Sequence, residues 1–156
     1  MKFSHLFLLV ATLLIMEFAV TLFHKHVMHG IGWGWHRSHH TPHEPAAWET
    51  NDWYAVVFTL LTILLFALGG THASLWWIAL GISLYGLLYG ILHDVLIHRR
   101  LRLKWRPKNR YIQRLTKAHY LHHAVKTREG AVSFGFLYTP PVAAIRRQLR
   151  NNTRKA

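Results

Sequence analysis

The sequence predicts an all-α integral membrane protein, with about three transmembrane helices and a cytoplasmic cap that is helical and rich in histidine. Three observations favour this fold class. Hydrophobic residues make up 51% of the chain and come in long blocks. The 19 Lys and Arg, against 6 Asp and Glu, lie almost entirely outside those blocks. Most of the 14 histidines gather where blocks end, at spacings that occur twice.

The three apolar blocks cover residues of about 3–23, 53–70 and 75–92. About 20 helical residues cross a hydrocarbon core of about 30 Å, so the blocks have the length of membrane spans, the second and third being slightly short. The first block contains Glu17 and lacks a small-residue cleavage site, so we expect a retained anchor and not a signal peptide. We expect residues 1–156 to form a single membrane-bound domain, with metal-binding segments at 24–52 and 93–141 and a basic tail at 142–156.

The charge distribution predicts the orientation of the spans. Lys2 is the only cation before the first span, and the turn at 69–74 contains none. Lys25 and Arg37 lie between the first and second spans, and all the others follow the third. Since cytoplasmic segments are enriched in Lys and Arg, we expect residues 24–52 and 93–156 to face the cytoplasm and the N-terminus to lie outside.

Ten histidines form a two-part module that occurs twice. An H-x4-H pair closes the first span and another closes the third, and an H-x2-HH triplet follows each pair. The predicted metal ligands are His24, His29, His36, His39 and His40 in the first module, and His93, His98, His119, His122 and His123 in the second. All ten lie on the side that the charges predict to be cytoplasmic.

The spacings indicate how these side chains could converge. Each residue of an α-helix advances about 100°, so an H-x2-HH triplet directs three imidazoles into one volume. An H-x4-H pair is separated by about 140°, and the sequence leaves open whether it brackets a metal or extends past the helix end. It also leaves open which module binds which metal. Imidazole suits zinc, copper, iron and nickel, and ten ligands exceed a single zinc site of about four, so two metals with about five ligands each fit better.

Several functional classes are excluded or disfavoured. The chain has no cysteine, which excludes disulfides, iron–sulfur clusters and thiolate zinc sites. No motif that reads nucleic acid accompanies the basic charge, so we expect membrane lipids and not nucleic acid as its partner. The zinc-protease motif H-E-x-x-H is absent. A membrane metal transporter or storage protein stays an alternative, although a transporter would carry polar ligands along its spans, and here the spans contain little besides Glu17.

Other polar residues are weaker candidates for the site. Asp94 adjoins His93 and could accept an N–H from a ligand histidine, the alternative being an ion pair with Arg99 or Arg100. The same role is open to Glu44, Glu49 and Asp52. The histidines expected not to bind metal are His5, His26, His43 and His72.

The spans contain further features of interest. Glu17 is costly in lipid unless it meets polar partners, and it could lie near a substrate path or contribute to packing. Tyr85 and Tyr89 share a helix face as an i, i+4 pair; they could line a substrate channel, and packing is the expected role. The apolar segment 132–141 is too short to span and is expected to lie at the interface and cover the histidines. Close helix packing is predicted at three glycines of the third span, Gly81, Gly86 and Gly90.

The histidine motifs and their surroundings resemble those of a known family. The strings HKHVMHG (24–30), HRSHH (36–40), LHDVLIH (92–98), AHYLHHAV (118–125) and VSFGFLYTPP (132–141) are similar to the bacterial beta-carotene 3-hydroxylases. These are membrane-bound non-haem di-iron enzymes of the fatty acid hydroxylase superfamily. The resemblance covers about residues 20–141, and the linking strings indicate the carotenoid branch.

The resemblance implies a function and its components. The protein would be a di-iron monooxygenase of the bacterial inner membrane, with the ten histidines binding two irons. It would use O2 and a ferredoxin-type electron donor to hydroxylate beta-carotene at C3 of each terminal ring, giving zeaxanthin via cryptoxanthin; canthaxanthin to astaxanthin is a related conversion. Hydroxylation or desaturation of another lipid or sterol is the alternative. The basic run at 99–110 suits anionic headgroups or the docking of an acidic ferredoxin.

Overall fold

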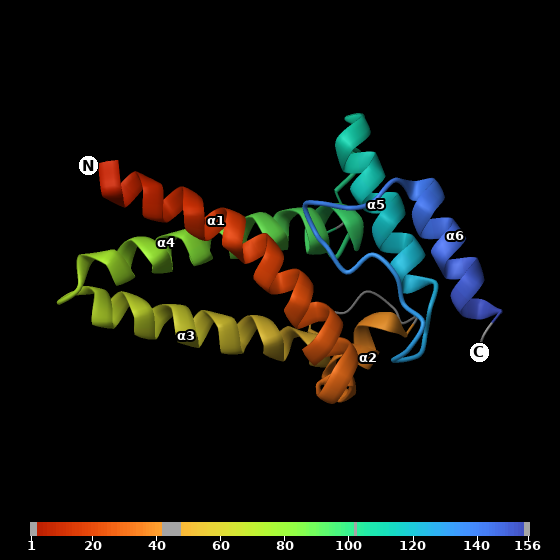
Figure 1. The fold of residues 1–156 in the computed structure, drawn as a ribbon, viewed down its shortest axis with the longest axis horizontal. Helices are drawn as coiled ribbons and strands as arrows, with labels where there is room; N and C mark the ends of the chain where they lie inside the picture. The colour runs from red at the N-terminus through yellow and green to blue at the C-terminus, as the bar shows by residue number, and fades with distance from the viewer. Residues whose placement is uncertain (1–2, 42–47, 102, 155–156) are drawn as a thin grey trace.

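The computed structural model describes residues 3–41, 48–101 and 103–154, and every regular element in these ranges is helical (Figure 1). The elements are α1 (Phe3–Phe23), η1 (His24–Ile31), α2 (Trp33–His40), η2 (Thr50–Asp52), α3 (Trp53–Gly69), α4 (Ala73–Tyr89), η3 (Gly90–Ile97), α5 (Arg110–His123) and α6 (Val142–Thr153). The elements η1 and η3 are π-helical, and η2 is a single 3₁₀ turn. The predicted all-α class is confirmed.

Three helical stretches are long and apolar enough to cross a membrane, namely Phe3–Ile31, Thr50–Gly69 and Ala73–Ile97. They begin close to the predicted spans, but the first and third continue past their apolar blocks into η1 and η3. The helix α1 exposes large apolar side chains, with Leu14 71% and Phe18 67% exposed. Such a surface suits contact with lipid, because the exposure of these apolar side chains to water would be unfavourable by the hydrophobic effect.

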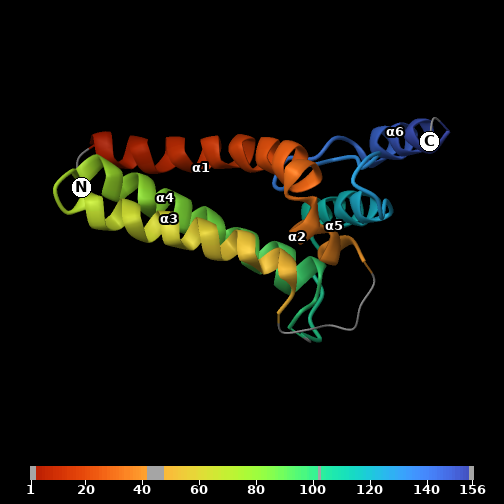
Figure 2. The ribbon, with the colours of Figure 1, turned by 90° about the horizontal axis from the view of Figure 1, so that it is seen from below.

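The helices α3 and α4 form an antiparallel hairpin, and α1 packs along α4 (Figure 2). Gly81 lies at the α1–α4 contact, where a Cβ atom would come within 2.7 Å of the Thr12 Cβ. A side chain at Gly81 would therefore separate the two helices, as the small-residue pattern predicted. At Gly86 and Gly90, by contrast, an added Cβ would meet no heavy atom of the described residues within 4 Å. The prediction of close packing is wrong for these two glycines, because no described helix comes into van der Waals contact there.

The two ends of the bundle differ in character. The N-terminus and the α3–α4 turn lie at one end, whereas α2 and α5 lie at the other (Figures 1 and 2). At the first end His5 stacks on Trp77, with ring centroids 5.1 Å apart, and His72 precedes α4. These two histidines lie far from the other end, as expected.

The π-helical elements explain the H-x4-H pairs. A π-helix forms i→i+5 backbone hydrogen bonds, so residues five apart lie on the same side. The His98 N–H donates to the His93 carbonyl at 2.8 Å, and the Gly32 N–H donates to the Val27 carbonyl at the same distance. The separation of about 140° that an α-helix would impose is thereby reduced. The first module then turns at Gly30, where the backbone leaves helical geometry and α2 can fold back.

The helices α5 and α6 cover the histidine end of the bundle. Ile145 of α6 is buried against Ala118 of α5 and Val132 of the connecting loop. Asn109 caps α5 by accepting from the Tyr111 and Ile112 backbone N–H groups. This packing directs the H-x2-HH triplet of α5 towards the ends of the membrane spans.

Candidate metal centre

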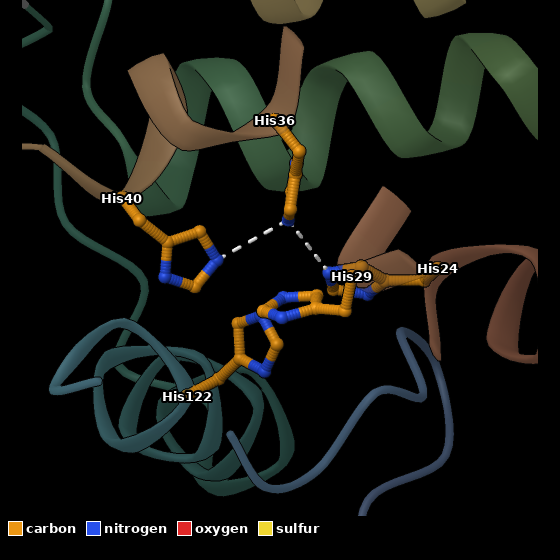
Figure 3. Close-up of side chains that lie close together, drawn as sticks. All are labelled: His24, His29, His36, His40 and His122. Atoms are coloured by element: carbon orange, nitrogen blue, oxygen red, sulfur yellow. Dashed lines mark hydrogen bonds between the residues drawn. The ribbon is translucent and has the colours of Figure 1, made fainter. Parts of the chain in front are cut away.

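The structure brings all ten predicted ligands to one end of the molecule, in two groups. The first imidazole group consists of His24, His29, His36, His40 and His122, whose ligand atoms lie within 4.8 Å of one another (Figure 3). The second imidazole group contains His39, His98, His119 and His123 within the same limit. His93 adjoins the second group, because its Nε2 lies 3.1 Å from the His39 Nε2.

Each group takes four histidines from one module and one from the other. On α2, His36 and His40 are four residues apart and differ by about 40° in direction, whereas His39 points about 60° to the other side of His36. His36 and His40 therefore meet the first group, and His39 meets the second. The α5 triplet divides in the same way, with His122 leaving its neighbours to join the first group. The H-x2-HH motif thus connects the two groups through both helices.

In the first group, each Nδ1 atom faces an oxygen that accepts a hydrogen bond. Four acceptors are backbone carbonyls and one is a side-chain amide: Phe134 O for His24 (3.1 Å), Arg128 O for His29 (2.9 Å), Val125 O for His40 (2.8 Å), Val132 O for His122 (2.8 Å) and Asn51 Oδ1 for His36 (2.8 Å). Since these oxygens cannot donate, the proton of each neutral imidazole lies on Nδ1 and the Nε2 lone pair is free.

The second group uses carboxylates for the same purpose. The His93 Nδ1 donates to Asp94 Oδ1 at 2.7 Å, and the His39 Nδ1 donates to Glu49 at 3.2 Å. The contact predicted for Asp94 is therefore present. Asp52 instead forms two 2.7 Å hydrogen bonds with Arg100, which also lies 3.7 Å from Glu49. Glu44 lies outside the described residues.

The Nε2 atoms approach one another at distances that suit a shared cation. The Nε2 atoms of His98 and His119 lie 2.7 Å apart. The pairs whose Nδ1 acceptors are described above are His24–His36 (3.1 Å), His36–His40 (3.2 Å), His29–His122 (3.2 Å) and His39–His93 (3.1 Å). In each pair both Nδ1 atoms carry the proton, so two lone pairs face each other and cannot form a hydrogen bond. Converging lone pairs repel unless a positive ion lies between them. The arrangement therefore fits a bound metal.

Burial favours the neutral form of the imidazoles. Desolvation lowers the pKa of His36 to about 3 and that of His40 to about 4, and the same cause with the neighbouring His93 lowers the pKa of His98 to about 3. Burial likewise lowers the pKa of His123, whose Nε2 is buried and has no hydrogen-bond partner among the described residues. Metal binding needs unprotonated imidazoles, and these remain unprotonated at neutral pH.

The donor set restricts the choice of metal. Each group presents only imidazole nitrogens, which suit borderline transition metals and not magnesium or calcium. Five imidazoles for each group, with His93 included, exceed the tetrahedral coordination of structural zinc. The residues fit a pair of metals of higher coordination number.

Comparison with known proteins indicates the family of the chain. Residues 9–140 match the fatty acid hydroxylase family. The chain belongs to that family. It is 48% identical over 147 residues to a protein named "Beta-carotene hydroxylase" from Paracoccus sp. (strain PC1), covering 93% of this chain and 90% of that protein. Proteins of the same name from Pantoea ananas and Pseudescherichia vulneris are 51% and 44% identical, covering 89% and 92% of this chain and 79% and 81% of those proteins. No solved structure matches the chain.

In this fatty acid hydroxylase, Glu17 attaches the loop after α5 to the first span. Its carboxylate accepts the backbone N–H groups of Phe136, Leu137 and Tyr138 at 2.9 to 3.0 Å, and the Tyr85 hydroxyl at 2.7 Å. These four donors satisfy a charge that would otherwise be costly in the membrane. The loop thereby covers the first group, with the Phe134 ring centroid 5.2 Å from that of His29.

Some partners of this hydroxylase centre could not be predicted. Four acceptors of the first group are backbone carbonyls, which leave no signal in the sequence. Asn51 could have been considered, because it is a polar residue beside Asp52 at the start of the second span. His26 is exposed, as expected for a residue that does not bind metal, and His43 lies outside the described residues.

Proposed function

We propose that this protein is a membrane di-iron monooxygenase that hydroxylates beta-carotene at C3 of its terminal rings, giving zeaxanthin via cryptoxanthin. The observation that carries the proposal is the convergence of ten imidazoles at one end of three membrane-spanning helices. The relatives named "Beta-carotene hydroxylase", at 44% to 51% identity over most of the chain, support the choice of substrate.

Two irons would occupy the two imidazole groups, with His93 completing the second. Bound iron supplies the oxidising power to break an unactivated C–H bond, which acid–base side chains cannot provide. Overall, one atom of O2 enters the C–H bond and the other leaves as water. The two electrons and two protons that balance this reaction come from a reduced donor of the ferredoxin type.

The residues of the chain have distinct tasks in this proposal. The carbonyls and carboxylates opposite the Nδ1 atoms fix each ring so that its Nε2 lone pair points to the metal. The carboxylates of Glu49 and Asp94 also add negative charge beside the second group. The rings of Phe134 and Tyr89 cover the imidazoles, the latter stacked on His93 at 4.5 Å, and limit the access of water.

A basic surface on the cap supports an acidic electron donor. Arg110, Arg114 and Lys117 lie on α5, and together with Arg146 of α6 they line a hollow of about 350 Å³. The same helix α5 carries three of the ten imidazoles. A negatively charged donor protein at this surface would be separated from the centre by little more than one helix, and the positive field would speed its approach. The cation distribution also supports a cytoplasmic position for this end.

Expression in cells that accumulate beta-carotene tests the proposal. The wild type should convert beta-carotene to hydroxylated carotenoids and should contain about two irons for each chain. His29→Ala should abolish the product and lower the iron content, whereas His26→Ala, which changes an exposed histidine of the same element, should leave both unchanged. Unconverted beta-carotene with iron-loaded wild type would refute the substrate, and a well-folded protein without bound transition metal would refute the centre.

A further inference from the structure

A cavity of about 420 Å³ lies between α1, α3 and α4. One of its ends is bordered by His93 and Asp94, beside the second imidazole group. Its other end reaches Phe66 of α3 and Ile82 of α4. His93 and Ile82 lie on one continuous helical stretch, where their separation corresponds to about 16 Å along the axis. The cavity is therefore a slot that runs from the metal centre along the spans.

The walls of the slot are mainly apolar along the spans, although Thr59, Thr62 and Ser83 also line it, and they are more polar at the metal end. Met16 and Val20 of α1 face Phe58 of α3 across it, whereas Asn51 and Asp52 border it only near His93. An apolar molecule would thus find mainly apolar walls, and a newly formed hydroxyl at the metal end would find polar groups.

The slot is closed near the centre and open to the bilayer farther away. The Phe23 ring contacts the rings of Tyr54 and Phe58 edge-on, at 5.6 and 5.1 Å, and closes the gap between α1 and α3. Two other lining residues, Ile63 and Leu87, are 57% and 62% exposed. Since these exposed residues belong to membrane spans, a ligand dissolved in the bilayer could enter beside them.

Two glycines give the slot its width. Gly86 and Gly90 both line it, and a Cβ atom at either position would meet no heavy atom within 4 Å in the part of the chain that the structure describes. Glycine destabilises a helix interior relative to alanine. At these two positions no close helix contact compensates for that loss of helix stability. The missing side chains instead leave free volume next to the metal centre.

We infer that this slot binds a carotenoid lengthwise, with one terminal ring beside His93 and the polyene passing Gly86 towards the middle of the bilayer. The inference rests on the proposed function and adds to it the site and orientation of the substrate. A rod-shaped isoprenoid fits a narrow slot parallel to the spans, and its methylated ring needs the extra width that Gly86 and Gly90 leave. Gly86 is in this view a specificity-determining position, because bulk there would fill the path of the polyene without touching the ligands.

Variants at Gly86 test the inference, with Ala67→Leu as the matched control. Ala67 is an exposed residue of α3 that does not line the slot, so the control adds similar bulk to a span elsewhere. Each variant is produced in beta-carotene-accumulating cells, and three quantities are measured: hydroxylated product, bound iron, and beta-carotene retained by the purified protein. We expect Gly86→Leu to lose at least about tenfold in product and in retained beta-carotene, with iron unchanged, because overfilling an occupied site opposes binding.

The milder variant Gly86→Ala keeps the test informative if Gly86→Leu fails to fold. It adds one methyl group and raises helix propensity, so it should fold and show a smaller loss in the same direction. Ala67→Leu should match the wild type. Product and retention at the control level in both Gly86 variants would overturn the slot while leaving the proposed function intact. A wild type that forms no hydroxylated carotenoid would instead refute the proposed function.

Discussion

The attachment of the loop 132–141 to the first span depends on a single carboxylate, so Glu17→Gln should release it. The carboxylate accepts four donors, and hydrogen bonds to a charged group contribute about 1.5–3 kcal/mol each. Glutamine keeps one acceptor oxygen and places an NH2 group where the Tyr85 hydroxyl or a loop N–H donates. We expect a loss of about 2–4 kcal/mol in the free energy of loop docking, because one strong bond is lost and the others become neutral.

Hydrogen exchange of the loop amides measures this loss directly. A change of about 2–4 kcal/mol corresponds to an increase of about 30- to 700-fold in the opening equilibrium of the loop, and thus in the exchange of the Phe136 and Leu137 amides. Iron in the first group should also decrease, because His24 and His122 lose the carbonyls of Phe134 and Val132 as fixed acceptors.

Tyr85→Phe provides a graded control for the same contact. It removes one of the four donors and leaves the carboxylate with its three backbone partners. Its effect on exchange should therefore be smaller than that of Glu17→Gln. If Glu17→Gln leaves both the exchange of the loop and the iron content at wild-type values, the carboxylate does not anchor the loop and the reasoning is wrong.

Three further predictions follow from the centre and the packing. Glu49→Gln should weaken metal binding in the second group by about 10- to 100-fold, seen in a metal titration, because His39 loses its charged acceptor. The metal-free protein should lose stability as the pH falls below about 6.5. Histidines of the unfolded chain take up protons there, whereas folded His36, with its pKa lowered to about 3, does not. A thermal unfolding temperature that is unchanged between about pH 8 and 5 would contradict this. Gly81→Leu should destabilise the bundle by about 1–3 kcal/mol through overpacking against α1, whereas Gly86→Leu should not, and equal melting temperatures for the two variants would exclude the packing difference.

Much of the fold followed from local properties of the chain. Apolar length predicted three spans, and their positions agree with the helices to within a few residues at their starts. The ends were harder to predict, because η1 and η3 extend the first and third spans with i→i+5 hydrogen bonds. A hydropathy pattern cannot distinguish a π-helix from an α-helix, so the H-x4-H spacing looked less suitable for convergence than it is.

The glycines show how the same residue can indicate two different structures. Gly81 and Gly86 both suggested close packing, yet only Gly81 has a helix against it. Which of them meets a neighbour depends on the path of α1 over α4, and the sequence of α4 does not contain that information. The free volume at Gly86 became visible only once three helices were in place.

The sequence by itself determined which ten imidazoles are the candidate ligands, because two repeats of one histidine spacing at the ends of two spans can be recognised without any tertiary contact. Only the tertiary structure decided how the ten imidazoles divide into two groups, with His39 and His122 exchanged between modules. It also decided what orients them, since the carbonyl that receives the His24 N–H lies 110 residues away in the chain. The physical reason is that spacing along a helix sets direction, whereas pairing across the molecule depends on how separate helices pack.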